Sequence, residues 1–287
     1  MKYLISFSTT INDIEYMDTE LRQLRLERSA YQYAGIDKHH HWTRGKLKRT
    51  SFYRENKEVL DLKQGAGYYL WKPYIIYDAL KRAETGDWIL YCDNSFYFVQ
   101  DAGILYELAE RNNGFGLYCY DRAYQIQHVM QPVTRKKLGI TDDLLQQPVT
   151  VGGFMMFRKN EDTMRFVGEW LELCLDAELL VDQKEPCPPE IKHRYDMPLL
   201  SYLRAVWNIE AFRLPHQSGD KNKMPAFRTP QDALVNGDDY DNIFENSPYG
   251  TLCIWDKEGI NCPRPWSHYL DPVKVLSFVR RKMARGN

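Results

Sequence analysis

The sequence predicts an α/β fold in which a mixed, mostly parallel central sheet is flanked by helices. Short apolar runs of strand length recur along the chain at 3–7, 88–92, 115–120 and 149–157. Between these runs lie segments in which apolar residues recur at helical spacing. The alternation of short buried strands with helices is typical of a layered α/β domain.

Composition favours one large domain. The 287 residues show neither an internal repeat nor a separable second core, and 44% of them are hydrophobic. A net charge of −1 gives no global field that would attract nucleic acid, so we expect no nucleic-acid partner. Residues 2–8 are too short for a signal peptide and no apolar run reaches membrane-spanning length, so we expect a cytoplasmic location.

The first strand is expected at 3–7 and the first helix at 16–34. The loop after the first strand of a nucleotide-binding α/β domain approaches the ligand, which makes Phe7, Ser8 and Thr9 pocket candidates. Ser8 or Thr9 could equally cap the helix. Three consecutive histidines at 39–41 cannot all face one ion, so we expect this stretch to be an exposed loop.

The stretch 68–95 organises the chain. A helix is predicted over 51–64, and after the glycines at 65 and 67 a second helix begins with Pro73 at its first position. Gly86 ends that helix, and the apolar run 88–92 predicts a buried strand. The strand leads into Asp93-Asn94-Ser95, and ligands of open α/β sheets bind at the carboxyl ends of the strands.

The second half of the chain continues the alternation. We predict a helix capped by Asp101, a strand at 149–157 interrupted by Gly152-Gly153, a helix capped by Asn160 and a helix that begins near Asp196. The polar stretch 121–148 suits either an acceptor-side lining or a solvated surface helix. A late strand is expected at 209–214, followed by an irregular segment at 215–265 and a basic helix at 271–285.

Two separated motifs carry a resemblance to a known family. They are Gly67-Tyr-Tyr-Leu-Trp-Lys-Pro73 with Tyr91-Cys-Asp-Asn-Ser95, and His193-Arg-Tyr-Asp-Met-Pro-Leu-Leu-Ser201. Their order and layout resemble bacterial surface-polysaccharide glycosyltransferases of the nucleotide-sugar-dependent GT-A type, over roughly residues 1–215. The chain departs from the family pattern at Ser95, where the family has a second Asp, and at Met197, where it has Gln.

The resemblance implies a single GT-A-like domain over 1–287. Residues 1–120 would form a Rossmann-like nucleotide-sugar-binding half, 121–214 an acceptor and catalytic half, and 215–287 a C-terminal wrap or lid with the basic helix. It implies transfer of a hexose-type sugar from a nucleoside diphosphate sugar, with UDP as the expected nucleotide. The acceptor would be a hydroxyl of a saccharide or lipid-linked saccharide in surface-polysaccharide biosynthesis. The alternative is a catalytically weak or inactive sugar-binding relative, because Ser95 weakens the metal motif.

The resemblance also implies roles for individual residues. Asp93 would ligate Mn²⁺ or Mg²⁺ and act in catalysis, because hard cations prefer oxygen ligands and offset the charge of the leaving diphosphate. Ser95, His216 and His268 are the further metal-ligand candidates. The donor-binding candidates are Phe7, Ser8, Thr9, Trp71, Lys72, Asp93, Asn94 and Ser95. Trp71 could equally be a core residue, and Lys72 a solvated residue near a helix start.

Asp196 is the second catalytic candidate. In an inverting enzyme it would deprotonate the acceptor hydroxyl, and in a retaining enzyme it would orient the donor sugar. A helix N-cap paired with Arg194 is the structural alternative. Gly152, Gly153, His193 and Arg194 are the acceptor- or sugar-binding candidates.

The helix expected at 271–285 has two interpretations. Its basic residues either complement the helix dipole or hold the protein peripherally on the inner face of an anionic membrane. They are Lys274, Arg280, Arg281, Lys282 and Arg285.

Overall fold

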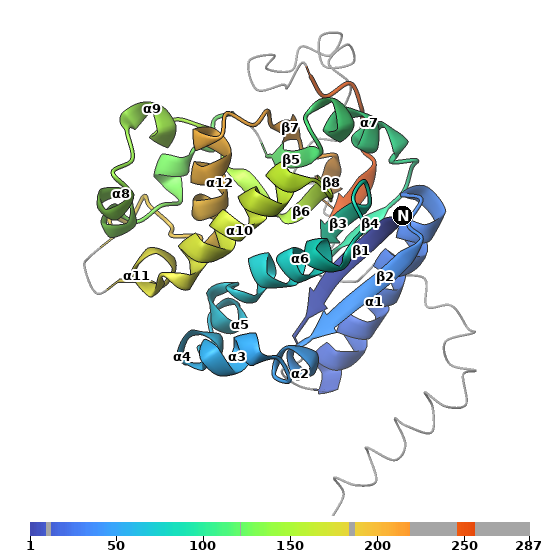
Figure 1. The fold of residues 1–287 in the computed structure, drawn as a ribbon, viewed down its shortest axis with the longest axis horizontal. Coiled ribbons are helices and arrows are strands. Elements are labelled where there is room, and N and C mark those ends of the chain that lie inside the picture. Colours follow the sequence, from blue (N-terminus) through green and yellow to red (C-terminus); the bar gives the residue numbers. More distant parts are fainter. Residues whose placement is uncertain (10–12, 121, 184–186, 219–245, 256–287) are drawn as a thin grey trace, which may run out of the picture.

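The computed structural model describes residues 1–9, 13–120, 122–183, 187–218 and 246–255 (Figure 1). Within these residues the main sheet has six strands in the order β2-β1-β3-β6-β5-β7. The strands are β1 (Lys2–Ser8), β2 (Lys38–Thr43), β3 (Trp88–Cys92), β5 (Phe115–Cys119), β6 (Thr150–Arg158) and β7 (Phe212–Arg213). Strand β6 pairs antiparallel with both of its neighbours, and the other three pairings are parallel. The expected mixed, mostly parallel sheet is therefore confirmed.

Helices cover both faces of this sheet (Figure 1). One face packs against α6 (Trp71–Arg82), α10 (Glu161–Leu175) and α12 (Asp196–Val206), with Ile5, Tyr91 and Phe157 in the shared core. The opposite face packs against α1 (Asp13–Tyr33) and α7 (Gly103–Arg111). Each strand sends alternate side chains to the two faces, which accounts for the two cores on either side of one sheet.

A small second sheet joins the described C-terminal chain to the segment after β3. It has the order β4-β9-β8, with β4 (Phe96–Phe98), β8 (His216–Ser218) and β9 (Cys253–Trp255). Strand β4 begins three residues after Asp93, so this sheet lies beside the end of β3. It brings His216, which pairs with Cys253 of β9, toward the same region.

Short helices fill the connections. Between β2 and α6 lie α2 (Arg44–Leu47), α3 (Ser51–Glu55), α4 (Lys57–Leu60) and α5 (Gly65–Tyr68). The stretch 121–148 contains η1 (Ile126–His128), α8 (Pro132–Leu138) and α9 (Asp142–Leu145), and α11 (Ala177–Leu180) follows α10. Asn160 caps α10 as predicted, because its side chain accepts a hydrogen bond from the Thr163 N–H at 2.7 Å.

Several local expectations were wrong. The three histidines form part of β2 and not an exposed loop, because this segment pairs with β1 along its whole length. The helix expected over 51–64 is broken at Asn56. Helix α6 begins at Trp71, so Pro73 occupies the third position, which is still within the first turn where N–H groups have no intrahelical partner. Helix α7 begins at Gly103, although Asp101 accepts the Gly103 N–H at 2.7 Å as a cap would.

The late strand is shorter than expected. Only Phe212–Arg213 pair with β5, whereas a strand was expected over 209–214. The helix expected at 271–285 and His268 lie outside the described residues, and the internal boundaries at 120 and 214 stay a prediction. In the part of the chain that the structure describes, no helix has both the length and the apolar character needed to span a membrane.

Candidate active site

Asp93 lies at the carboxyl end of β3, where the strand pattern predicted a ligand-facing carboxylate. Its backbone N–H donates to the Gly153 carbonyl oxygen at 2.9 Å, which continues the β3–β6 pairing by one residue. The Tyr91 hydroxyl donates to Asp93 Oδ1 at 2.6 Å. Tyr91 is fully buried and Asp93 is half-buried. One carboxylate oxygen is therefore held from within the core while the side chain keeps access to solvent.

Lys72 is a buried ammonium at the start of α6. Its Nζ lies 3.5 Å from Asp196 Oδ2, and the two side chains are only 5% and 4% exposed. The ammonium also lies over three aromatic rings, 4.9 Å from the Tyr69 centroid, 5.6 Å from Trp71 and 5.5 Å from Tyr91. The alternative of a solvated lysine is wrong, because this side chain is enclosed by aromatic faces and a carboxylate.

Asp196 is the first residue of α12, and its carboxylate does not cap that helix. Tyr195 occupies the N-cap position with φ 61° and ψ −109°, and no side chain makes a capping hydrogen bond there. The Asp196 carbonyl oxygen accepts a hydrogen bond from Trp170 Nε1 at 3.1 Å. An unusual backbone conformation at Tyr195 thus precedes a carboxylate that faces Lys72 instead of its own helix.

The two glycines of β6 make room for these charged groups. A Cβ on Gly153 would lie 2.8 Å from Asp93 Oδ2, closer than real Cβ contacts allow. A Cβ on Gly152 would lie 3.3 Å from Asp196 Oδ2 and 3.4 Å from Lys72 Nζ. Because neither glycine has a Cβ, both carboxylates and the ammonium can approach this short piece of strand closely.

Burial and neighbouring charges shift the pKa values of Lys72 and Asp196. Burial raises the pKa of Asp196 to about 6, with Lys72 opposing the shift and Asp93 adding to it. Burial alone would lower the pKa of Lys72, but the carboxylates of Asp196 and Asp93 outweigh it and the pKa is raised. At neutral pH both partners are consequently charged, and Asp196 is the carboxylate whose proton affinity lies nearest to neutrality.

The candidates near the first strand divide into core and polar residues. Phe7 and Trp71 stack at 3.8 Å between ring centroids and are 6% and 4% exposed. Trp71 Nε1 donates to the Gly65 carbonyl at 3.0 Å, so packing favours the core interpretation of this tryptophan. The Ser8 hydroxyl forms a 2.7 Å hydrogen bond with His41 Nε2, and Thr9 is the last described residue before α1.

The metal-ligand candidates are only partly assembled. Asn94 is half-buried and Ser95 is buried, directly after Asp93. His216 lies edge-on to Phe96 at 6.0 Å, and Phe96 also lies beside Gly153. Burial, followed by the charge of Arg213, lowers the pKa of His216 to about 4, which keeps its imidazole neutral as a metal ligand requires. Among the residues that the structure describes, no three His, Cys, Asp or Glu side chains are grouped as a metal site.

His193 and Arg194 precede Asp196 but do not join it. His193 is buried, its Nε2 makes a 3.1 Å hydrogen bond with the Leu180 carbonyl, and its ring meets Tyr195 edge-on at 5.3 Å. Arg194 is exposed, and its backbone N–H donates to the Val129 carbonyl at 3.0 Å. These contacts hold the turn that orients Tyr195 and Asp196. A role of either side chain toward a sugar stays a prediction.

Sequence reasoning missed the tyrosines of this site. Tyr91 holds Asp93, and Tyr69 lies beneath the Lys72 ammonium and stacks near Tyr195 at 6.2 Å. The signal for Tyr91 was available, because a tyrosine one residue before the end of an otherwise apolar buried strand needs a partner for its hydroxyl. Tyr69 has φ 62°, which a local pattern does not reveal.

A scan against protein-family models and a search of curated proteins give no match. Among solved structures, the apo form of mouse xyloside xylosyltransferase 1 is similar to this chain at 10% identity and a TM-score of 0.47. That similarity covers 92% of this chain and 100% of the other. The galactosyltransferase LgtC, solved in complex with donor and acceptor sugar analogs, is similar at 12% identity and a TM-score of 0.43, over 91% of each chain. Both similarities concern the course of the backbone.

Proposed function

We propose that this chain is a glycosyltransferase that transfers a hexose-type sugar from a nucleoside diphosphate sugar, with UDP as the nucleotide. The acceptor is a hydroxyl of a saccharide or lipid-linked saccharide in surface-polysaccharide biosynthesis. One observation carries the proposal. Asp93, Lys72 and Asp196 come from three separate elements and converge on the Gly152–Gly153 backbone at the carboxyl end of β3. Ligands of α/β sheets bind at this end of the strands.

The reaction moves an electron pair onto the leaving diphosphate and a proton off the acceptor hydroxyl. The bond from the anomeric carbon to the diphosphate breaks and its electron pair leaves with the diphosphate, while the acceptor oxygen bonds to that carbon and releases its proton. The buried Lys72 ammonium supports the developing negative charge, because a fixed cation acts strongly in a site that excludes water. Asp196, with a pKa of about 6, accepts the acceptor proton if transfer inverts the anomeric configuration. If transfer retains it, Asp196 orients the donor sugar instead.

A divalent cation is the remaining expectation. Mn²⁺ or Mg²⁺ would, when bound, offset the charge of the leaving diphosphate. Asp93 offers a hard oxygen ligand, and Ser95 offers a neutral one next to it. In the described part of the chain these two are not joined by the further carboxylate or imidazole ligands that would complete a site, so the steps above rest on protein groups alone. Ligation by His216 or His268 stays a prediction.

The decisive experiment measures sugar transfer from a panel of UDP- and GDP-sugars, with and without Mn²⁺, in wild type and Asp93→Asn. The substitution removes the negative charge while preserving the shape and the contact with Tyr91. We expect transfer to be lost and the melting temperature to be unchanged. Asp143→Asn, at an exposed position of α9, is the matched control. Normal transfer by Asp93→Asn would contradict the proposal, and stabilisation by sugars without any turnover would favour the sugar-binding alternative.

A second variant separates the two roles of Asp196. If the carboxylate is the general base, Asp196→Asn should lower kcat by about 10²- to 10⁴-fold with donor affinity nearly unchanged. A large loss of donor affinity would indicate that it orients the sugar. Because this change leaves Lys72 without its partner, the melting temperature must be measured in parallel, and Asp196→Asn with Lys72→Met is the control for the unpaired charge.

A further inference from the structure

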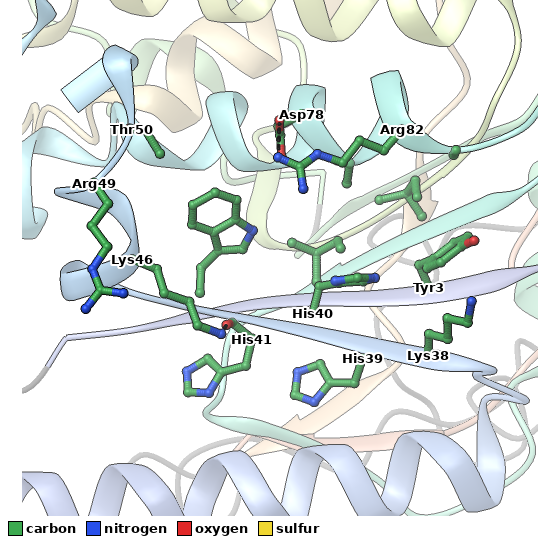
Figure 2. A pocket seen from close by; sticks show the side chains of 15 residues that line it. Tyr3, Lys38, His39, His40, His41, Lys46, Arg49, Thr50, Asp78 and Arg82 are labelled. Atoms are coloured by element: carbon green, nitrogen blue, oxygen red, sulfur yellow. Dashed lines mark hydrogen bonds and ion pairs between the residues drawn. The ribbon is translucent and has the colours of Figure 1, made fainter. Parts of the chain in front are cut away.

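A pocket of about 630 Å³ lies between the edge strand β2 and the C-terminal half of α6 (Figure 2). Strands β1 and β2 form its floor, α6 forms one wall, and the chain from α2 to Thr50 forms another. Sites for small molecules have volumes of roughly 300–1,000 Å³. Lys72, Asp93 and Asp196 do not line this pocket, so it is separate from the candidate active site.

Strand alternation selects the side chains that reach the pocket. The parallel pairing of β1 with β2 places Lys38 beside Tyr3 and His40 beside Ile5. Figure 2 shows His40 pointing toward α6, whereas His39 and His41 point to the other side of the strand. On that side His39 and His41 make hydrogen bonds of 2.9 and 2.7 Å with the hydroxyls of Ser6 and Ser8. All three histidines contribute to the pocket lining, and His40 is the one whose side chain points toward α6.

The lining is strongly cationic. Four basic side chains come from different segments, namely Lys38, Lys46, Arg49 and Arg82. Asp78 is the acidic residue among the lining residues, so the formal balance is four minus one, or +3, when His40 is neutral. Arg82 pairs with Asp78 at 3.0 Å, and Lys46 Nζ donates to the His41 carbonyl at 2.7 Å.

The His40 imidazole lies close enough to these basic side chains for their charges to affect it. Burial lowers its pKa first, then the charges of Arg82, Lys38 and Lys46 lower it further, while Asp78 opposes them. Three cations from α6, β2 and α2 thus act on one imidazole. Groups of like charge gathered around one concave space repel one another, and an anion placed among them relieves that repulsion.

The floor of the pocket is apolar and aromatic. Trp42, Tyr3 and Ile5 line it together with Ile89 of the neighbouring strand β3, and Ala79 adds an apolar side chain from the α6 wall. The ring of Tyr3 lies 5.7 Å from that of His40, and Trp42 packs edge-on against Tyr74 at 6.1 Å. Flat aromatic surfaces of this kind contact the rings of bases and sugars. The pocket therefore combines a cationic rim with a surface for a ring.

We propose that this pocket is a second binding site, for a small phosphate-bearing molecule that also carries a ring. Lys38 and Arg82 hold the phosphate near the end of the pocket where β2 begins, since ammonium and guanidinium groups bind phosphate oxygens. Trp42, two residues beyond His40 on the same strand, contacts the ring. The proposal is independent of the assignment of the active site, because it uses none of the residues that carry that assignment.

The test follows His40 by NMR while inorganic pyrophosphate is added to the full-length protein. Bound pyrophosphate should raise the pKa of His40, because a nearby anion favours the charged imidazole. The side chains of His39 and His41 point to the other side of β2, so their pKa values should shift less than that of His40. Lys38→Gln with Arg82→Gln should weaken binding at least about tenfold, which corresponds to 1.4 kcal/mol. Both residues are exposed, so the fold should tolerate the change.

The control variant Arg28→Gln with Lys63→Gln removes the same charge from exposed positions outside the pocket and should bind like wild type. The proposal is overturned if pyrophosphate leaves His40 unchanged, if sodium chloride at equal ionic strength gives the same shift, or if both double variants bind equally. Uridine monophosphate should shift His40 at lower concentration than inorganic phosphate does. Equal concentrations would refute the contact with a ring.

Discussion

Replacing Lys72 by Met tests the buried ion pair directly. Lys72 Nζ and Asp196 Oδ2 lie 3.5 Å apart, with side chains 5% and 4% exposed, so neither charge has water as an alternative partner. Methionine keeps the length and apolar stem of lysine but lacks the ammonium. Breaking a buried pair by removing one partner destabilises a protein by roughly 3–5 kcal/mol, because the remaining charge is left uncompensated.

The loss should depend on pH in a defined direction. The folded pKa of Asp196 is about 6, above its usual 3.8, so between these values the folded state binds more protons than the unfolded state. Stability consequently falls as pH rises through this window, by about 3 kcal/mol for a shift of about two units. Without Lys72 the carboxyl pKa rises further, so the deficit is largest at pH 8 and small at pH 5. The raised pKa of Lys72 acts only in alkaline solution, outside this range.

Urea unfolding at pH 5 and pH 8 would measure this difference in wild type, Lys72→Met, and Lys72→Met with Asp196→Asn. The double variant has no buried charge at this position, so it should regain most of the stability that the single variant loses at pH 8. An equal loss for Lys72→Met at both pH values would refute the reasoning. So would a double variant that is as unstable as the single one at pH 8.

Three further changes give independent tests. Gly153→Ala would place a Cβ 2.8 Å from Asp93 Oδ2, so we expect a loss of about 1–3 kcal/mol in unfolding free energy together with weaker donor binding. Normal binding would show that Asp93 is free to move. Tyr91→Phe removes the 2.6 Å hydrogen bond that positions Asp93, and since a misplacement of about 1 Å can cost about 10²-fold in rate, kcat/KM should fall at least about tenfold. An unchanged kcat/KM would contradict this role. Burial lowers the pKa of His39 to about 4, so the folded state binds fewer protons than the unfolded state and stability should fall as pH drops from 6.5 toward 4. His39→Gln should remove that part of the acid sensitivity in unfolding titrations, and an identical acid profile would count against it.

Local pattern determined most of the architecture. The apolar run 88–92 coincides with β3, and the helix predicted to begin near Asp196 begins at that residue. Asn160 caps its helix as its position predicted. These features follow from side-chain spacing and capping chemistry within a few residues, so a sequence reveals them. The same reasoning correctly located Asp93 at the end of a buried strand.

Local pattern failed where pairing over long range decides the conformation. The histidines at 39–41 look like a polar loop, yet they form an edge strand because β1 supplies hydrogen bonds along its length. The helix break at Asn56 and the left-handed backbone at Tyr69 were equally hidden. Such positions are fixed by what packs around them and not by their own propensities.

For the candidate site, the sequence by itself identified the charged residues Asp93, Lys72 and Asp196 and the glycines at 152 and 153. Only the tertiary structure decided how they combine. It buried Lys72 against Asp196, turned the Asp196 carboxylate away from its helix cap and placed Tyr91 behind Asp93. The physical reason is that a carboxylate's role depends on desolvation and on the charges within a few ångströms, and both are set by segments distant in sequence.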